Sequence, residues 1–149
     1  MGWVDPLRGK VIGIDTAPVI YYVEKNLLYI EMLRPFFQLV HNGECAVVTS
    51  IVTLLEGLVV PIRKSDTDLM REYYDFLFNA EGVTTISLFP DIAEVAARLR
   101  AFYNIRTPDS IQMATALKAD ASFFLTNDKK FPSIPELKVL LLDDLKANS

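Results

Sequence analysis

The chain is poor in the two residues that most often build metal and redox sites. Its 149 residues include one cysteine, Cys45, and one histidine, His41. A single cysteine excludes an internal disulfide framework and any zinc site with several cysteines, and it is typical of a reducing compartment. A single histidine leaves little room for a metal site built on imidazole groups. Metal chemistry in this chain would therefore depend on oxygen ligands.

Long apolar runs and a strong positive charge are also absent. The apolar stretch Val11–Val23 is interrupted by Asp15 and Pro18, whereas a membrane-spanning helix needs about 20 apolar residues. The first ten residues lack the basic-then-apolar order of a secretory signal. We therefore expect a cytoplasmic protein with no membrane partner. The formal charge of −4 argues against nucleic-acid binding by bulk electrostatics, but it allows a local basic rim.

What is present is the composition and pattern of one globular α/β domain, predicted over residues 1–149. The chain is 51% hydrophobic and 23% charged, and short apolar runs alternate with segments of helical periodicity, as in βαβ units with a parallel sheet. The expected strands are Val11–Ile14, Cys45–Thr49, Val83–Leu88, Phe123–Thr126 and Val139–Leu142. The expected helices are Ala17–Val23 capped by Thr16, Leu27–His41, Ile51–Ile62, Leu69–Phe78, Ile92–Tyr103, and a last one from Thr107 to about Ala119.

Four carboxylates occur where such a fold can bring side chains together. Asp15 and Asp128 follow apolar strands, and ligands of open parallel sheets bind beyond the carboxyl ends of the strands. Asp109 lies in the first turn of a helix for which Thr107 is the expected N-cap. Glu56 interrupts an otherwise apolar helix, and a buried carboxylate must be paired, protonated or bound to a metal.

Each carboxylate also has an ordinary structural explanation. Asp15 would be explained as a helix N-cap, Asp109 as a partner of a helix dipole, and Asp128 as an ordinary turn residue. A salt bridge to Arg63 would explain Glu56. The four together, however, fall on element ends or on a buried face consistent with one rim of the sheet. A set of oxygen ligands favours Mg²⁺ or Mn²⁺.

The four acids lie in motifs that closely resemble those of PIN-domain ribonucleases. The motifs are Ile12-Gly13-Ile14-Asp15-Thr16, Thr53-Leu54-Leu55-Glu56-Gly57, Arg106-Thr107-Pro108-Asp109-Ser110 followed by Ala114-Thr115-Ala116, and Phe124-Leu125-Thr126-Asn127-Asp128. Within that family the chain is most similar to the VapC-type toxins of type II toxin–antitoxin pairs. The resemblance covers about residues 10–144 and implies a three-layer α/β/α fold with a five-stranded parallel sheet. Ser110 departs from the alanine that the family often has.

The resemblance implies a metal-dependent ribonuclease. Divalent ions held by carboxylates stabilise the charge that develops during phosphodiester hydrolysis, so no histidine, serine or cysteine nucleophile is needed. RNA as the substrate comes from the resemblance alone. We expect Asp15 and Asp109 as central ligands of Mg²⁺ or Mn²⁺, and Glu56 and Asp128 as direct or water-mediated ligands. The expected supporting residues are Thr16, Thr126 and Asn127 beside the metal, and Arg106 and Lys129 against the substrate.

Partners are expected on similar grounds. The segments Ile51–Ile62 and Leu69–Phe78 offer more apolar surface than one sheet face covers, and the family usually dimerises. We therefore expect a homodimer, together with a cognate antitoxin that places a basic side chain near the acids.

Two other classes of function stay open. A Mg²⁺-dependent phosphatase would want a second aspartate two residues after Asp15, where Ala17 stands, and a phosphoacceptor domain would want an acidic pair at the first strand. A non-catalytic PIN-like interaction module usually lacks one or more of the acids, and here all four are present.

Overall fold

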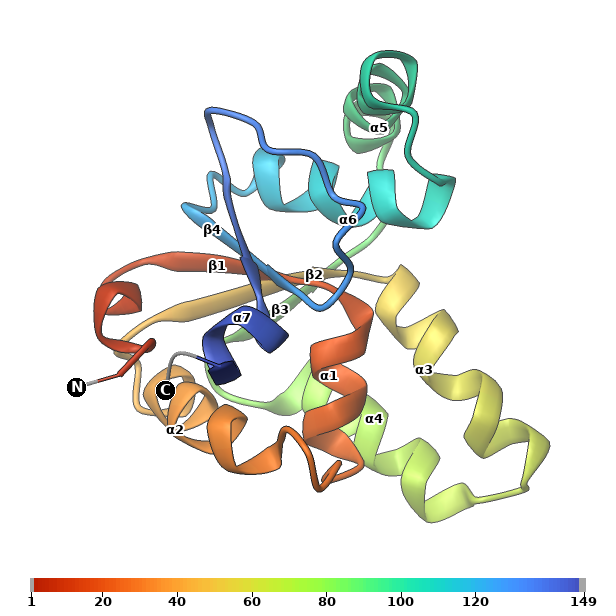
Figure 1. Cartoon of the computed structure of the whole chain (residues 1–149). Coiled ribbons are helices and arrows are strands. Elements are labelled where there is room, and N and C mark those ends of the chain that lie inside the picture. The colour runs from red at the N-terminus through yellow and green to blue at the C-terminus, as the bar shows by residue number, and fades with distance from the viewer. Residues whose placement is uncertain (1, 148–149) are drawn as a thin grey trace.

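Five parallel strands form the centre of the protein (Figure 1). The computed structural model describes residues 2–147. The strands are β1 (Val11–Ile14), β2 (Ala46–Ser50), β3 (Val83–Ile86), β4 (Phe123–Thr126) and β5 (Lys138–Leu141). Their order across the sheet is β3-β2-β1-β4-β5, and every neighbouring pair is parallel. The prediction of an α/β fold with a five-stranded parallel sheet is confirmed.

Helices cover both faces of this sheet. They are α1 (Thr16–Val23), α2 (Ile30–His41), α3 (Val52–Arg63), α4 (Thr67–Asn79), α5 (Pro90–Tyr103), α6 (Thr107–Lys118) and α7 (Leu142–Ala147), with a short 3₁₀ turn η1 (Asp5–Leu7) before β1. Helices α5 and α6 lie on one face, and α1, α2 and α4 lie on the other (Figure 1). Within residues 2–147, no helix combines the length and apolarity needed to cross a bilayer.

The central strand β1 is buried on both faces. Ile12 and Ile14 belong to the hydrophobic core shared with α1, α2 and α4. Gly13 faces the opposite way, toward Ala116 of α6 and Phe124 of β4. Because successive residues of a strand point to opposite faces, a strand covered by helices on both sides needs apolar or small residues throughout. The packing on both faces therefore fixes the carboxyl end of β1 in position.

The strand order reverses at β1. The chain runs from β1 to β2 and β3 on one side, and it later adds β4 and β5 on the other side. In open α/β sheets, ligands bind beyond the carboxyl ends of the strands at such a reversal. The ends of β1 and β4 are therefore where the fold favours a site.

Two predicted helix caps are wrong by one residue. Asp15, rather than Thr16, is the N-cap of α1, because its carboxylate accepts a hydrogen bond from the backbone N–H of Thr16 at 2.9 Å. Arg106, rather than Thr107, occupies the N-cap position of α6. Both threonines are instead the first residues of their helices.

The helix predicted from Leu27 begins at Ile30, as α2. Lys25 has a φ of 53°, and the side chain of Asn26 accepts a hydrogen bond from Leu28 N–H at 2.9 Å. Together these features form a turn, which leaves Leu27 91% exposed. Helix α7 and the turn η1 were not predicted, whereas the remaining boundaries shift by at most two residues.

Replacing Gly13 by alanine tests the close packing of β1 against α6. A Cβ at this position would lie 2.4 Å from the Ala116 Cβ and 3.1 Å from Cδ1 of Phe124. We expect Gly13→Ala to lower the free energy of unfolding by about 1–3 kcal/mol, as overpacking of cores does. Urea denaturation measures the change. The control is Gly2→Ala, since a Cβ there meets nothing within 4 Å, and equal stability of the two variants would contradict the packing.

Candidate active site

The four acids line one pocket beyond the carboxyl ends of β1 and β4. It has a volume of about 300 Å³ and contains Asp15, Glu56, Asp109 and Asp128. They come from four separate places, which are the N-cap of α1, the middle of α3, the first turn of α6 and the loop after β4. The remaining lining residues are Thr16, Ala17, Ile20, Tyr21, Arg106 and Asn127.

Asp15 is the most buried of the four acids, with 7% of its surface exposed. Its Oδ1 accepts the Thr16 N–H at 2.9 Å, and its Oδ2 accepts the hydroxyl of Thr126 at 2.7 Å. Burial raises the pKa of Asp15 to about 6; the two hydrogen bonds oppose this shift, and the charges of Asp109 and Glu56 add to it. The pocket therefore holds a buried carboxylate whose charge a cation would relieve.

Glu56 is half-buried, so the expectation of a buried carboxylate in an otherwise apolar helix is corrected. Leu55 and Val59 on either side of it are exposed, so much of the apolar surface of α3 faces outward. The Oε1 of Glu56 accepts the hydroxyl of Thr16 at 2.6 Å. Among the described residues it forms no ion pair with Arg63, so a salt bridge does not explain its position.

Asp109 has a side chain that is 14% exposed and lies 3.1 Å from Nε of Arg106. Arg106 itself is 69% exposed, and an ion pair with such an exposed partner contributes little to stability. The guanidinium is therefore placed at the mouth of the pocket without being tightly held there.

Thr126, the last residue of β4, connects two of the acids. Its hydroxyl donates to Asp15 and accepts the backbone N–H of Asp128 at 3.1 Å. The backbone N–H of Asp15 donates to the carbonyl of Leu125 at 2.9 Å. The Oδ1 of Asp128 also accepts the N–H of Lys130 at 2.9 Å. Asp128 is thus a turn residue and a lining residue of the pocket at once.

A buried polar network behind the acids was missed by the sequence analysis. Nε2 of Gln112 donates to the hydroxyls of Thr16 and Thr53, at 3.1 and 2.8 Å. The hydroxyl of Thr49 lies 2.7 Å from that of Thr53 and donates to the Ile14 carbonyl at 2.8 Å. In residues 2–147, no buried side-chain nitrogen or oxygen lacks a hydrogen-bond partner. Sequence spacing could have indicated these residues, because residues three apart share a helix face. Gln112 is three residues after Asp109, and Thr53 is three residues before Glu56.

Two supporting residues are placed differently from expectation. The side chain of Asn127 lines the pocket but hydrogen-bonds the hydroxyl of Tyr29 and the N–H of Asp143, both at 3.1 Å. It therefore supports α7 and not a carboxylate. Lys129 is exposed and lies outside the lining of the acidic pocket. The next residue, Lys130, is the lysine that lines a cavity together with Arg106.

The chemistry of the pocket fits a hydrated divalent cation. Among residues 2–147, no three Asp, Glu, His or Cys side chains are close enough to ligate one ion directly. Mg²⁺ commonly uses only one or two carboxylates and keeps several waters. Asp15 and Asp109 provide buried or nearly buried carboxylates, and because burial raises the pKa of Asp15, a bound cation would stabilise its ionised form.

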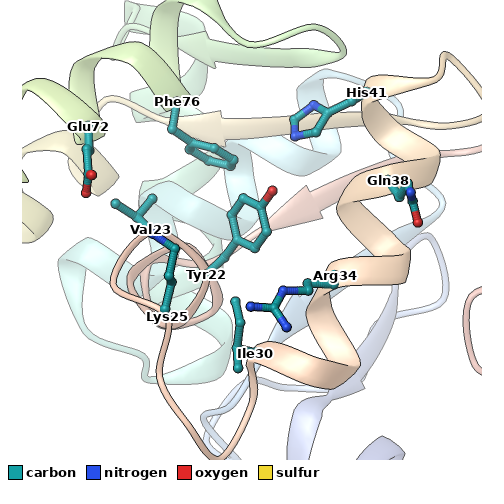
Figure 2. A pocket seen from close by; sticks show the side chains of 9 residues that line it. All are labelled: Tyr22, Val23, Lys25, Ile30, Arg34, Gln38, His41, Glu72 and Phe76. Carbon is teal, nitrogen blue, oxygen red and sulfur yellow. The ribbon is translucent and has the colours of Figure 1, made fainter.

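A larger cavity lies away from the acids, among α1, α2 and α4 (Figure 2). Its volume is about 480 Å³. The rings of Tyr22 and Phe76 face into it, with Lys25 and Arg34 nearby (Figure 2). Its only carboxylate among the described lining residues is Glu72, so this cavity does not offer the acidic chemistry found at the edge of the sheet.

The sequence profile of the PIN domain matches residues 14–137, which include all four acids. The chain belongs to the PIN domain family. The resemblance found in the sequence motifs is thereby confirmed. A search of curated proteins finds no match.

Solved structures share this PIN fold. VapBC2 from Rickettsia felis bound to a promoter DNA fragment has a TM-score of 0.67 at 18% identity, over 88% of this chain and 98% of that one. DNA-bound VapBC from Salmonella typhimurium has a TM-score of 0.63 at 19% identity, over 89% and 98%. A toxin–antitoxin complex from Klebsiella pneumoniae has a TM-score of 0.58 at 23% identity, over 85% and 94%. At these identities the likeness establishes a common fold.

The raised pKa of Asp15 in this PIN domain predicts a pH-dependent effect of Asp15→Asn. The folded state favours the protonated carboxyl of Asp15. The stability that this group contributes is therefore fully present below its unfolded pKa of 3.8 and is lost as the pH rises through its folded pKa of about 6. Without divalent cations, Asp15→Asn should therefore match wild type near pH 4 and be more stable above about pH 7, by up to about 3 kcal/mol.

Urea denaturation in EDTA across this pH range measures the difference. Asp91→Asn is the control, because Asp91 lies on α5 outside the pocket. A stability difference for Asp15→Asn that does not change with pH would contradict the burial of an ionisable carboxyl at this position.

Proposed function

We propose that the protein is a Mg²⁺- or Mn²⁺-dependent ribonuclease that hydrolyses RNA phosphodiester bonds. The observation that carries this proposal is the meeting of four carboxylates, from four separate places in the chain, in one pocket of a PIN domain. Such a collection of like charges is unfavourable unless a cation offsets it. The exposed Arg106 at the same pocket supplies a positive group for a phosphate.

Asp15 and Asp109 are the proposed central ligands, because both are nearly buried and lie at fixed positions. Glu56 and Asp128 are half-buried and suit ligation through water. When bound, the divalent ion supplies stabilisation of negative charge on the phosphate and a bound water of lowered pKa.

The hydroxyls of Thr16 and Thr126 hold two of these carboxylates in place. Thr16 donates to Glu56, and Thr126 donates to Asp15. Groups that orient metal ligands through hydrogen bonds commonly change metal affinity or activity by about 10–100-fold when they are removed. Gln112 in turn holds Thr16. The proposed role of this network is to fix the geometry of the acids before the cation binds.

The same geometry disfavours a phosphoacceptor role. Both oxygens of Asp15 already accept hydrogen bonds, and the side chain is almost fully buried. A nucleophilic carboxylate has to present an oxygen to its substrate. Each oxygen keeps a second lone pair that can ligate a cation, so we propose that Asp15 binds a cation and does not form an acyl phosphate.

Purified protein should cleave single-stranded or structured RNA in Mg²⁺ or Mn²⁺, and EDTA should stop the reaction. Asp109→Asn keeps the size of the side chain but removes its charge, so cleavage should fall by at least about 100-fold. Gel analysis of a labelled RNA measures this. The matched control is Asp91→Asn, since Asp91 lies in the first turn of α5 as Asp109 lies in the first turn of α6.

A second readout separates metal binding from catalysis. At about 100 times its dissociation constant, Mn²⁺ should stabilise wild type and the control by about 2.7 kcal/mol and Asp109→Asn by much less. Cleavage that persists in EDTA, or an equal response of Asp109→Asn and Asp91→Asn to Mn²⁺, would rule out the proposed site.

We further propose that the protein is the cytoplasmic toxin of a toxin–antitoxin pair and binds a cognate antitoxin. The sequence motifs resemble those of VapC-type toxins, and the structures of similar fold include VapBC and toxin–antitoxin complexes. The acidic pocket suits a basic side chain of such a partner, since one cation at its mouth, Arg106, faces four carboxylates.

A homodimer is proposed on the basis of exposed apolar side chains on α3 and α4. These are Leu55, Val59, Val60, Ile62, Tyr74 and Phe78. Light scattering should report a dimer at micromolar concentration. Phe78→Glu should shift it toward the monomer because a charge in an apolar interface is costly, whereas Leu27→Glu in the loop before α2 should not. A monomeric wild type would refute the dimer.

A further inference from the structure

A smaller pocket lies beside the acidic one. Its volume is about 260 Å³, and its lining includes Arg106 and Asp109, which also line the acidic pocket. The other lining residues are Asn104, Ile105, Lys130 and Phe131. The two pockets therefore meet at the Arg106–Asp109 ion pair, so a chain-like ligand in one can extend into the other.

The floor of the smaller pocket is apolar and well supported. Ile105 and Phe131 are both buried, and the ring of Phe131 lies 4.9 Å from that of Phe124 in β4. Arg100 holds the backbone around Ile105, because its Nε donates to the Ile105 carbonyl at 2.9 Å and its Nη1 to the Thr107 hydroxyl at 2.8 Å. The pocket is thus formed before any ligand binds.

The rim of the smaller pocket is cationic. Arg106 and Lys130 are exposed, and Lys130 forms no ion pair within residues 2–147. The backbone N–H of Lys130 donates to Asp128 at 2.9 Å. Asp128, one of the four acids, therefore also holds the backbone of Lys130 in place. Lys129, one residue earlier, is exposed but does not line the pocket.

We propose that this pocket binds the nucleotide adjacent to the scissile phosphate of a single-stranded RNA. Lys130 and Arg106 contact its phosphate, and its base or ribose packs on Ile105 and Phe131. An apolar floor next to cations is the combination by which proteins hold single-stranded nucleic acid. This inference rests on the proposed ribonuclease function and assigns to Lys130 the role that sequence position had suggested for Lys129.

The adjacent lysines give a matched test. In steady-state cleavage of a short single-stranded RNA, Lys130→Ala should raise KM by at least about tenfold with little change in kcat, because a charge-assisted contact to the substrate is lost. The slope of log KM against log salt should fall by about one. Lys129→Ala should change neither quantity, and Lys130→Arg should restore most of the loss. Equal KM values for Lys130→Ala and Lys129→Ala would overturn the inference.

A binding measurement keeps the inference separate from the proposed function. Fluorescence anisotropy of a labelled RNA pentamer in EDTA reports binding even if the protein cleaves no RNA. Weaker binding by Lys130→Ala than by Lys129→Ala supports the subsite, and equal binding rejects it. If an oligoglutamate of equal charge binds more tightly than the RNA, and this binding is lost in Lys130→Ala, the RNA subsite is also rejected. The pocket would then be assigned to an acidic protein segment. Absence of metal-dependent cleavage by wild type, in contrast, counts against the ribonuclease function.

Discussion

The candidate site depends on one buried carboxylate, that of Asp15. This residue directly follows the central strand β1, serves as the N-cap of α1 and accepts a hydrogen bond from the hydroxyl of Thr126 at the end of the neighbouring strand. Each of these contacts stabilises the ionised form, yet burial outweighs them and raises the pKa to about 6. The fold thus holds a carboxylate where its charge is unfavourable, and the rest of the pocket surrounds it with further acids.

The polar network behind the acids explains how so many unfavourable groups keep their positions. Gln112 reaches across to Thr16 and Thr53, so α6, α1 and α3 are joined at the level of the site. A fully satisfied buried network fixes relative positions more strictly than apolar contacts do, because a shift leaves a buried polar atom without a partner. The geometry of the site is therefore a property of the helix packing, and only Asp128 depends on a loop.

The sequence predicted the sheet and the meeting of the four acids because both follow from local patterns. Apolar runs mark the strands, and strands in a parallel sheet bring the residues after them to one edge. The spacing of Gln112 from Asp109 places both on one helix face, but its partner Thr16 is 96 residues distant and could not be recognised from a local pattern. The choice between Lys129 and Lys130 depends on a turn made by Asp128, which sequence position alone does not fix. Glu56 was expected to be buried because its neighbours are apolar, but three of them, Leu55, Val59 and Val60, are exposed.

The link between Thr126 and Asp15 has a consequence for the spacing of the site. The hydrogen-bond ladder between β1 and β4 ends with the backbone N–H of Asp15 on the carbonyl of Leu125. The hydrogen bond from the Thr126 hydroxyl to the Asp15 carboxylate then extends this ladder by one side-chain interaction. Neighbouring strands are about 4.8 Å apart in any β-sheet. The separation between Asp15 and Thr126 is therefore set by the strand spacing common to all β-sheets, and the loop that carries Asp128 starts from this fixed point.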